Sequence, residues 1–308
     1  MRALDPQVRR RTLLQGTALA AMAWVARPVL RRAQAQQAVA AITAKAVDRA
    51  PADPDDPIWP GMVGTPIPLN PQNRALPRLT EAGASSVDLK AVYDADRISI
   101  LIEWPDAHKD ADLGTVMQYR DGVAVMFPED PAVGATSILM GIRGRAVVIY
   151  HWKADWQFAQ LHDVDEAYPN MYADWYQGSG VEAGEISEAT DYLSAGRPEF
   201  LTAAAVDNDL ADPRAQASIG PVQKMRAEGF GTIEPNDVQD AQGVGAWEDG
   251  AWRIVISMPR KQTNFTWEEG SPLPVALAVW DGSRNERNGQ KAFSEWQEMS
   301  LGAVEALP

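Results

Sequence analysis

Hydrophobic and polar residues alternate with a period of two along two neighbouring segments, 87–93 and 98–104. Because successive side chains of a β-strand point to opposite faces, this alternation is typical of strands that bury one face. Between the segments, Asp94-Ala95-Asp96 has the composition of a tight turn. The pattern therefore predicts a β-hairpin with one buried face.

Further short apolar runs, with turn residues at their ends, recur along the chain, and no convincing long amphipathic helix interrupts them. The strands expected from these runs cover residues 122–127, 146–152, 243–247, 252–258, 275–279 and 294–301. From 161 to about 217 the chain is acidic and irregular, as expected of a long functional or interface loop. Together these features predict an all-β fold, an antiparallel β-sandwich with long irregular loops and few short helices.

Residues 1–36 have the three parts of an export signal: a basic region that ends at Arg11, an apolar run over 13–26, and a small-residue cleavage site at Ala33-Gln34-Ala35. Within this segment, Arg10-Arg11-Thr12-Leu13-Leu14-Gln15 fits the twin-arginine pattern. The alternative is a basic amphipathic helix on the mature protein. We expect a periplasmic protein without a membrane span, because the apolar run is too short to cross a bilayer.

The mature chain is expected to have two parts. Residues 37–86 contain many prolines, each of which removes a backbone hydrogen-bond donor, so this segment should run extended over the surface of the domain. Trp59 and Ile67 are candidates to pin it there. Residues 87–308 hold the expected strands and form the predicted sandwich domain.

Composition and charge exclude several kinds of function. The 308-residue chain has a net charge of −14, and without the seven arginines and one aspartate of residues 1–36 it carries −20. Such a field repels nucleic acid and anionic membrane surfaces. The chain has no cysteine, which excludes disulfides, thiolate metal sites and covalent c-type haem attachment. Only His108, His151 and His162 could offer an imidazole ligand.

The residues alone leave the function open. No nucleophile elbow, phosphate-binding glycine loop or zinc-protease motif is present. Eleven tryptophans could stack on sugar rings, which makes a carbohydrate-binding module one hypothesis and a scaffold without a ligand another. Trp104 and Trp252 lie in phase with buried isoleucines and are expected in the core, whereas Trp59, Trp175 and Trp267 are freer to serve a surface.

Five segments carry a recognisable combination of residues in a fixed order. They are Asp121-Gly122-Val123-Ala124-Val125-Met126-Phe127-Pro128, Met140-Gly141, Tyr150-His151-Trp152-Lys153-Ala154-Asp155-Trp156-Gln157, Ala227-Glu228-Gly229-Phe230-Gly231-Thr232 and Trp247-Glu248-Asp249-Gly250-Ala251-Trp252. Together they resemble the haem b-binding gamma subunit of the type II branch of the dimethyl sulfoxide reductase family. Relatives of that kind serve in ethylbenzene and dimethyl sulfide dehydrogenases and in chlorate, perchlorate and selenate reductases. The resemblance spans roughly Val87 to Leu301.

The resemblance implies a β-sandwich that holds one non-covalent haem b, with a methionine and a lysine as axial ligands of the iron. Carried over segment by segment, these ligands are Met140 and Lys224. Without the resemblance, such a methionine would be ordinary core filling and such a lysine an ordinary surface charge. The alternatives are Met117 or Met126 for the sulfur, and Lys153 or His151 for the nitrogen. Lys153 lies between two tryptophans and could instead make cation–π contacts.

The resemblance also implies partners. An iron–sulfur beta subunit and a molybdenum-cofactor alpha subunit would complete a heterotrimer with this chain. The chain would then pass electrons between the iron–sulfur subunit and a periplasmic cytochrome or other carrier. No substrate chemistry is expected on it, so it is predicted to be a non-catalytic electron-transfer subunit.

Overall fold

The computed structural model describes residues 41–112, 117–158, 208, 213–263 and 265–303. The predicted export signal and most of the acidic stretch 161–217, with His162 and Trp175, lie outside the described residues. No helix in the described ranges is both long and apolar enough to cross a membrane.

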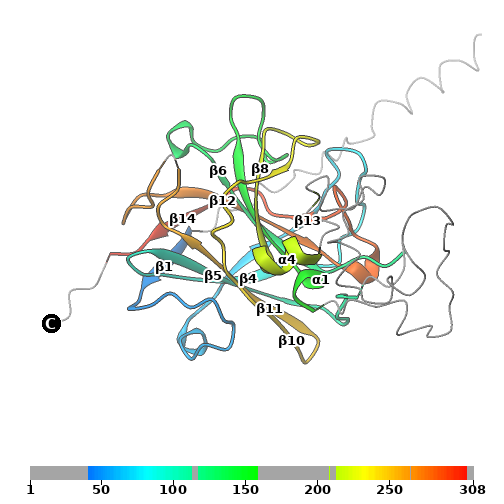
Figure 1. The fold of residues 1–308 in the computed structure, drawn as a ribbon, viewed down its shortest axis with the longest axis horizontal. Helices are drawn as coiled ribbons and strands as arrows, with labels where there is room; N and C mark the ends of the chain where they lie inside the picture. The colour runs from blue at the N-terminus through cyan, green and yellow to red at the C-terminus, as the bar shows by residue number, and fades with distance from the viewer. Residues whose placement is uncertain (1–40, 113–116, 159–207, 209–212, 264, 304–308) are drawn as a thin grey trace, which may run out of the picture. The chain divides into compact units, whose positions relative to one another are not determined.

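The described strands form one continuous hydrogen-bonded path that folds over into the two layers of a β-sandwich, as the alternation predicted (Figure 1). The first layer contains β10 (Gly245–Glu248), β11 (Ala251–Pro259), β5 (Arg97–Pro105), β4 (Ser86–Tyr93) and β2 (Thr65–Pro68). The second contains β14 (Gln297–Leu301), β12 (Leu273–Trp280), β6 (Gly122–Pro128), β7 (Val147–Lys153), β8 (Val222–Ala227), β9 (Glu234–Pro235), β13 (Ala292–Phe293) and β3 (Asn70–Pro71).

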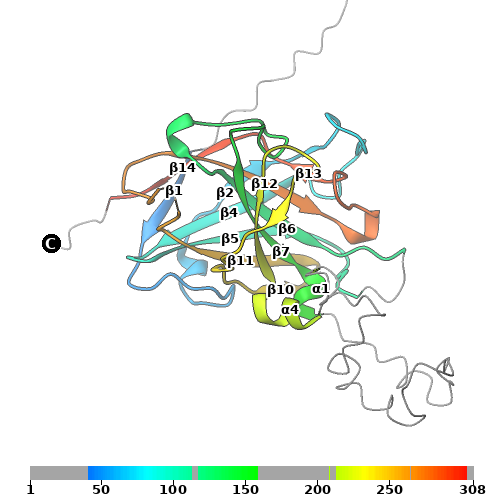
Figure 2. The same cartoon turned by 45° about the horizontal axis from the view of Figure 1, so that its top comes forward.

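Strand β1 (Ala41–Ala46) joins the two layers. It pairs in parallel with β14 through its first four residues and with β4 through its last two. The remaining strand pairs are antiparallel within the described residues, so the sheet is mixed rather than purely antiparallel. Figure 2 shows the strands β4, β5 and β11 of the first layer together with β6, β7 and β12 of the second. In the part of the chain that the structure describes, helices are few and short: α1 (Ala154–Phe158), α4 (Pro213–Ile219), and the 3-10 turns η1 (Trp59–Gly61), η2 (Pro131–Val133) and η5 (Gly282–Arg284).

The predicted hairpin is β4 and β5, with Tyr93 paired to Ile98 across the Asp94–Asp96 turn. The expectation that only one of its faces is buried is wrong. The second face is covered by the proline-rich segment, so that Leu101 and Val92 are fully buried against Trp59. A strand between two apolar surfaces loses the exposed side that alternation normally implies.

The proline-rich segment is pinned by Trp59 and Ile67, which are 1% and 0% exposed, as predicted. Their burial also means that Trp59 does not serve a surface, contrary to the other expectation for this residue. The same correction applies to Trp267, which packs edge-on against Phe127 with ring centroids 4.9 Å apart. Short strands β1, β2 and β3 within this segment join the sheets by backbone pairing.

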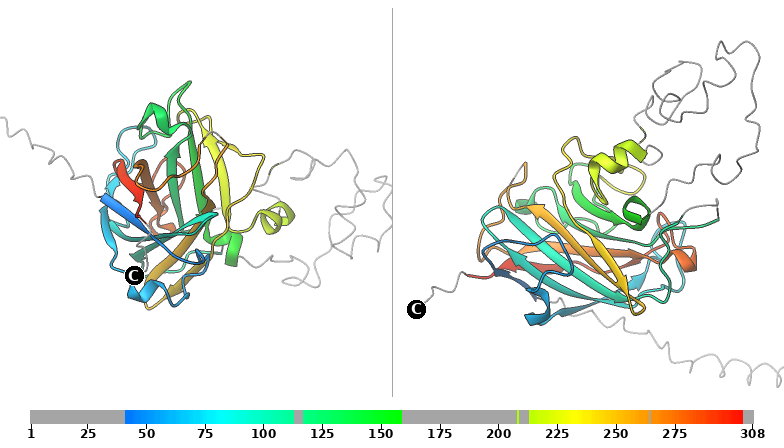
Figure 3. Two further views of the ribbon diagram at one scale, coloured as in Figure 1. Left: turned by 90° about the vertical axis from the view of Figure 1, so that its left-hand side faces the viewer. Right: turned by 60° about the horizontal axis from the view of Figure 1, so that its bottom comes forward.

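The main core lies between the two layers (Figure 3). Ile102 and Trp252 of the first layer and Val125 and Trp152 of the second all belong to it. Trp152 and Trp252 meet edge to face, with ring centroids 5.0 Å apart. Burying each such side chain contributes about 1.5–3 kcal/mol to stability, so this interface is the main source of the fold's stability. The expectation that Trp104 and Trp252 are core residues is confirmed.

Candidate functional site

The Met140-Gly141 step is a tight turn in the loop between β6 and β7. Met140 has φ +65° and Gly141 has φ +83°, both in the left-handed region. A Cβ at Gly141 would lie 2.8 Å from the carbonyl oxygen of Arg145 and 3.2 Å from that of Ala227. The turn therefore needs glycine for its backbone angle and for the close approach of the neighbouring strand.

This turn is held directly against the segment that follows β8. The backbone N–H of Gly229 donates to the Met140 carbonyl at 2.7 Å, and the N–H of Gly144 donates to Glu228 Oε2 at 3.3 Å. Two of the segments that carry the family resemblance, Met140-Gly141 and Ala227–Thr232, thus lie side by side although more than eighty residues separate them.

Met140 packs on the face of the second layer that points away from the main core. We call the group of side chains on this face the methionine cluster. Its buried members are Ala124, Met126, Val147, Ile149, Met225, Ala227 and Ala276, and the partly buried Ile138, Met140, Trp280 and Trp296 pack against them. Three members are methionines and three are alanines, and the two tryptophans pack against the buried residues.

Two nitrogen-bearing side chains, those of His151 and Lys291, contact Trp280 beside the methionine cluster. The His151 ring stacks on the Trp280 ring at 4.6 Å and 24°, and the Lys291 ammonium lies 5.0 Å from the centre of the same ring. Burial lowers the pKa of Lys291 to about 8. Burial first, and then the charges of Lys153, Arg120 and Lys291, hold the pKa of His151 well below 6.5.

Lys224 lies on the opposite face of the second layer. It pairs with Tyr150, alternates with Met225 along β8, and is 4% exposed. Its ammonium makes an ion pair with Asp240, at 2.9 Å to Oδ2 and 3.1 Å to Oδ1, and lies 5.7 Å from the centre of the Tyr150 ring. Since successive side chains of a strand alternate, the structure does not bring Lys224 to the face that Met140 occupies.

The alternative ligands are distributed as follows. Met126 is a buried member of the methionine cluster, whereas Met117 is 70% exposed. Lys153 is 1% exposed, donates to Gln223 Oε1, and lies 3.5 Å from the centre of the Trp156 ring. The expected cation–π contact of Lys153 with a neighbouring tryptophan is thus confirmed.

Lys291 was not among the candidates derived from the sequence. It follows the turn closed by Arg287 and Gln290 and precedes β13, and nothing in its local sequence marks it out. Its position beside His151 and Trp280 depends on the pairing of β13 with β12, which only the tertiary structure supplies.

The donor atoms on this face are of the kinds that can ligate a haem iron. A haem needs an apolar wall and neutral axial donors; the methionine cluster offers thioethers, and Lys291 beside it offers an amine of lowered pKa. With no cysteine in the chain, any haem is held without thioether links to its vinyl groups.

The fold and this face define a β-sandwich protein with a thioether- and amine-bearing apolar face. The family model described as "Ethylbenzene dehydrogenase" matches residues 56–292, and the chain belongs to this family, as the resemblance predicted. The matched range includes Met140, Lys224 and Lys291.

Two curated relatives match the chain at low sequence identity. The "Putative respiratory nitrate reductase heme subunit ORF7" of Haloferax mediterranei is 19% identical over 255 residues, which cover 82% of this chain and 69% of the relative. The "Chlorate reductase subunit gamma" of Ideonella dechloratans is 23% identical over 225 residues, which cover 71% and 66%. The chain thus spans about two thirds of the length of these relatives.

Among solved structures, a carbohydrate binding module of family 9 from Caldicellulosiruptor kristjanssonii, in complex with glucose, has a TM-score of 0.42 and 11% identity. The alignment covers 87% of this chain and 98% of that module. The same module with cellotriose has a TM-score of 0.40. A likeness at this level does not bear on function.

Proposed function

We propose that this protein is a haem-containing electron-transfer subunit, of the gamma type, of a molybdenum oxidoreductase. Its family and the names of two relatives, a heme subunit and a gamma subunit, support the proposal. The structural observation that carries it is the Met140 turn, anchored on Gly229, which packs the Met140 thioether onto an apolar face that also bears Lys291. We propose haem b as the cofactor, without covalent attachment.

We propose Met140 as the sulfur ligand. Its thioether is neutral, so it favours the ferrous state and raises the reduction potential. Trp280 and Trp296 border the same cluster and would exclude water from the haem. When bound, the haem iron supplies a one-electron couple, and the residues of this chain hold it, orient it and set its surroundings.

Besides the alternatives His151 and Lys153, the nitrogen ligand has two main candidates. Lys224 is implied by the family resemblance, and Lys291 lies on the face of Met140. To bind iron on the face of Met140, Lys224 would have to break its ion pair with Asp240 and pass to the other side of β8. Lys291 needs neither change, since no ion pair holds it among the described residues, and burial lowers the pKa of its ammonium to about 8, which reduces the cost of forming the neutral amine. We therefore propose Lys291, and keep Lys224 as the alternative that the same experiment tests.

The partners and location follow from the same proposal. An iron–sulfur beta subunit and a molybdenum-cofactor alpha subunit would deliver or remove electrons, and a periplasmic cytochrome or other carrier would exchange them outside the complex. The strongly acidic chain suits a carrier with a basic docking face. The twin-arginine pattern of residues 10–15 supports export to the periplasm. Catalysis would belong to another subunit.

The visible spectrum of protein produced with its signal in a haem-sufficient host tests the function. We expect a Soret band with the sharp α and β bands of a reduced low-spin haem. A colourless protein that gains no Soret band when hemin is added would refute the proposal. An iron–sulfur partner should also co-purify when the neighbouring subunits are expressed together.

Four variants then test the ligands. Met140→Leu should convert the low-spin spectrum to a high-spin one, as should Lys291→Ala, because each leaves the iron with one axial ligand. Lys224→Ala should retain the low-spin spectrum; if it alone turns high-spin, Lys224 is the ligand. Lys45→Ala, an exposed lysine on β1, serves as the matched control and should match the unmodified protein.

The structure contradicts part of the carbohydrate-binding hypothesis. Of the three tryptophans expected at the surface, Trp59 and Trp267 are buried, and Trp175 lies outside the described residues. Quenching of tryptophan fluorescence by oligosaccharides in haem-free protein would still reveal such binding.

A further inference from the structure

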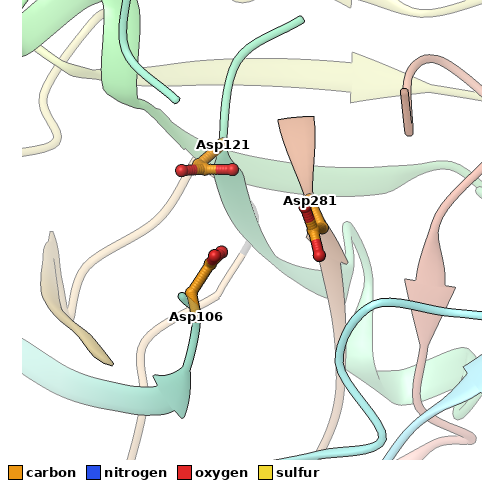
Figure 4. A group of neighbouring side chains, drawn as sticks. All are labelled: Asp106, Asp121 and Asp281. Carbon is orange, nitrogen blue, oxygen red and sulfur yellow. The ribbon is translucent and has the colours of Figure 1, made fainter. Parts of the chain in front are cut away.

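Three aspartates from three strand ends meet at one edge of the sandwich (Figure 4). Asp106 follows β5, Asp121 precedes β6, and Asp281 follows β12. One carboxylate oxygen from each lies within 4.8 Å of the others. The three residues are 7%, 0% and 9% exposed, respectively, so the cluster is buried and spans both layers.

Little positive charge offsets these carboxylates. Arg284 approaches Asp281, with Nε 3.7 Å from Oδ2, but its own side chain is half exposed. His108 lies near the adjacent Asp110, and Glu286 adds a further carboxyl beside Asp281. Buried charges are normally paired or bind a metal, and a group of buried acids without a matching cation is costly.

A carboxylate oxygen aimed into the cluster has no partner. Asp106 accepts a hydrogen bond from the His108 N–H through Oδ1, whereas its buried Oδ2 accepts none. Figure 4 shows the Asp106 carboxylate pointing towards Asp121 and Asp281. The Trp104 indole lowers the Asp106 pKa, but its N–H does not reach hydrogen-bond geometry. A buried oxygen of this kind calls for a missing partner.

A second oxygen shows the same deficit. Oδ2 of Asp110, which lies next to the cluster, is also buried and accepts no hydrogen bond. Asp121 is different, because it is fixed by three donors: the N–H of Gly282 at 2.8 Å, the N–H of Asp110 at 2.7 Å and the Trp252 indole at 3.0 Å. Asp121 is thus firmly oriented, while Asp106 and Asp110 each present one unsatisfied oxygen.

The electrostatics agree with this geometry. Burial, with added repulsion from Asp281, raises the pKa of Asp106 to about 6. Burial, with added repulsion from Asp106, raises the pKa of Asp121 to about 7. A bound divalent cation would neutralise the repulsion between these carboxyl groups.

We propose that Asp106, Asp121 and Asp281 bind a calcium ion, with Asp110 as an additional ligand. The donors are carboxylate oxygens, which hard cations prefer, and no sulfur or nitrogen ligand joins them in the described part of the chain. Calcium suits the site better than magnesium because it tolerates irregular geometry and takes carbonyl and water oxygens as further ligands. The ion would link the ends of β5, β6 and β12, and so fasten the two layers together.

The test uses full-length protein freed of metal with EDTA. Titration with CaCl2 in a calorimeter at pH 7.5 should give one site per chain, and calcium should raise the midpoint of thermal unfolding. Asp106→Asn keeps the shape of the side chain but removes a charged ligand, so it should weaken calcium binding by at least about tenfold. Asp96→Asn, at an exposed aspartate in the β4–β5 turn, is the control and should bind calcium normally.

A structural role alone would give a different result. If the cluster only keeps protons, calcium will neither release heat nor raise the unfolding midpoint, and the proposal is overturned. Calcium binding that Asp106→Asn leaves unchanged would place the ion elsewhere and overturn it as well. If calcium does bind, Asp106→Asn should raise the unfolding midpoint in EDTA, because repulsion is reduced, and lower it relative to the unmodified protein in CaCl2. Magnesium that binds as tightly as calcium would overturn the choice of ion.

Discussion

Replacing Gly141 by alanine is expected to destabilise the fold and the proposed haem site together, and Gly144 provides a matched control. Both glycines lie in the same loop in left-handed conformations, with φ +83° and +78°. A Cβ at Gly141 would meet two carbonyl oxygens at 2.8 and 3.2 Å, whereas a Cβ at Gly144 would meet nothing within 4 Å. The pair therefore separates backbone strain from steric conflict.

The magnitudes follow from these two contributions. The left-handed conformation costs alanine about 1–2 kcal/mol relative to glycine, which is the whole effect expected of Gly144→Ala. At Gly141 the 2.8 Å contact is with backbone, which cannot rotate away, so overpacking adds about 1–3 kcal/mol. We expect Gly141→Ala to reduce the free energy of unfolding by about 2–5 kcal/mol.

Urea denaturation, followed by tryptophan fluorescence, measures both costs, and transfer of haem to apomyoglobin measures retention of the cofactor. Gly141→Ala should also lose haem faster than Gly144→Ala, since moving the turn away from Ala227 displaces Met140. Equal destabilisation by the two substitutions would refute the steric argument. Equal haem loss, with unequal stability, would instead refute the role of Met140 while leaving the packing argument intact.

Three further predictions concern the core and the acidic cluster. In EDTA, the free energy of unfolding should fall by about 1 kcal/mol between pH 6.5 and 8. Burial raises the Asp121 pKa to about 7, so at the lower pH the folded state holds a proton that the unfolded state has already lost. Stability therefore declines as pH rises. Urea titrations across this range that are flat or rising would contradict it. Gln157→Ala should cost about 2–4 kcal/mol in the same assay. Gln157 accepts hydrogen bonds from the Gly245 N–H at 2.7 Å and the buried Trp152 indole at 2.8 Å, and donates to the Gly245 carbonyl at 2.8 Å. A cost below about 1 kcal/mol would show that water replaces these bonds. Trp252→Phe should cost about 2–4 kcal/mol, because it removes packing and the indole hydrogen bond to Asp121. It should also steepen the pH dependence of the free energy of unfolding, and an unchanged slope would contradict this prediction.

The strands were largely predictable from local pattern. Alternation placed the hairpin of β4 and β5 and the strands β6, β7, β10, β11 and β12 close to their observed bounds. The strand β8 was missed, since Lys224 and Arg226 occupy positions where an apolar side chain would have signalled a buried face. These residues are accommodated by ion pairs with Asp240 and Glu129, which come from distant parts of the chain.

The sequence by itself determined the all-β class and the family. It also excluded attachment of a haem through cysteine and indicated Met140-Gly141 as a candidate site. Period two tells which residues of a strand share a face, but not whether that face meets the other layer or the outside. That choice put Lys224 beside Asp240 and left Met140 and Lys291 on the outer face. Likewise, three aspartates spread over 176 positions become one cluster only because β5, β6 and β12 end at the same edge. Such proximity depends on strand pairing between distant segments, which local sequence does not encode.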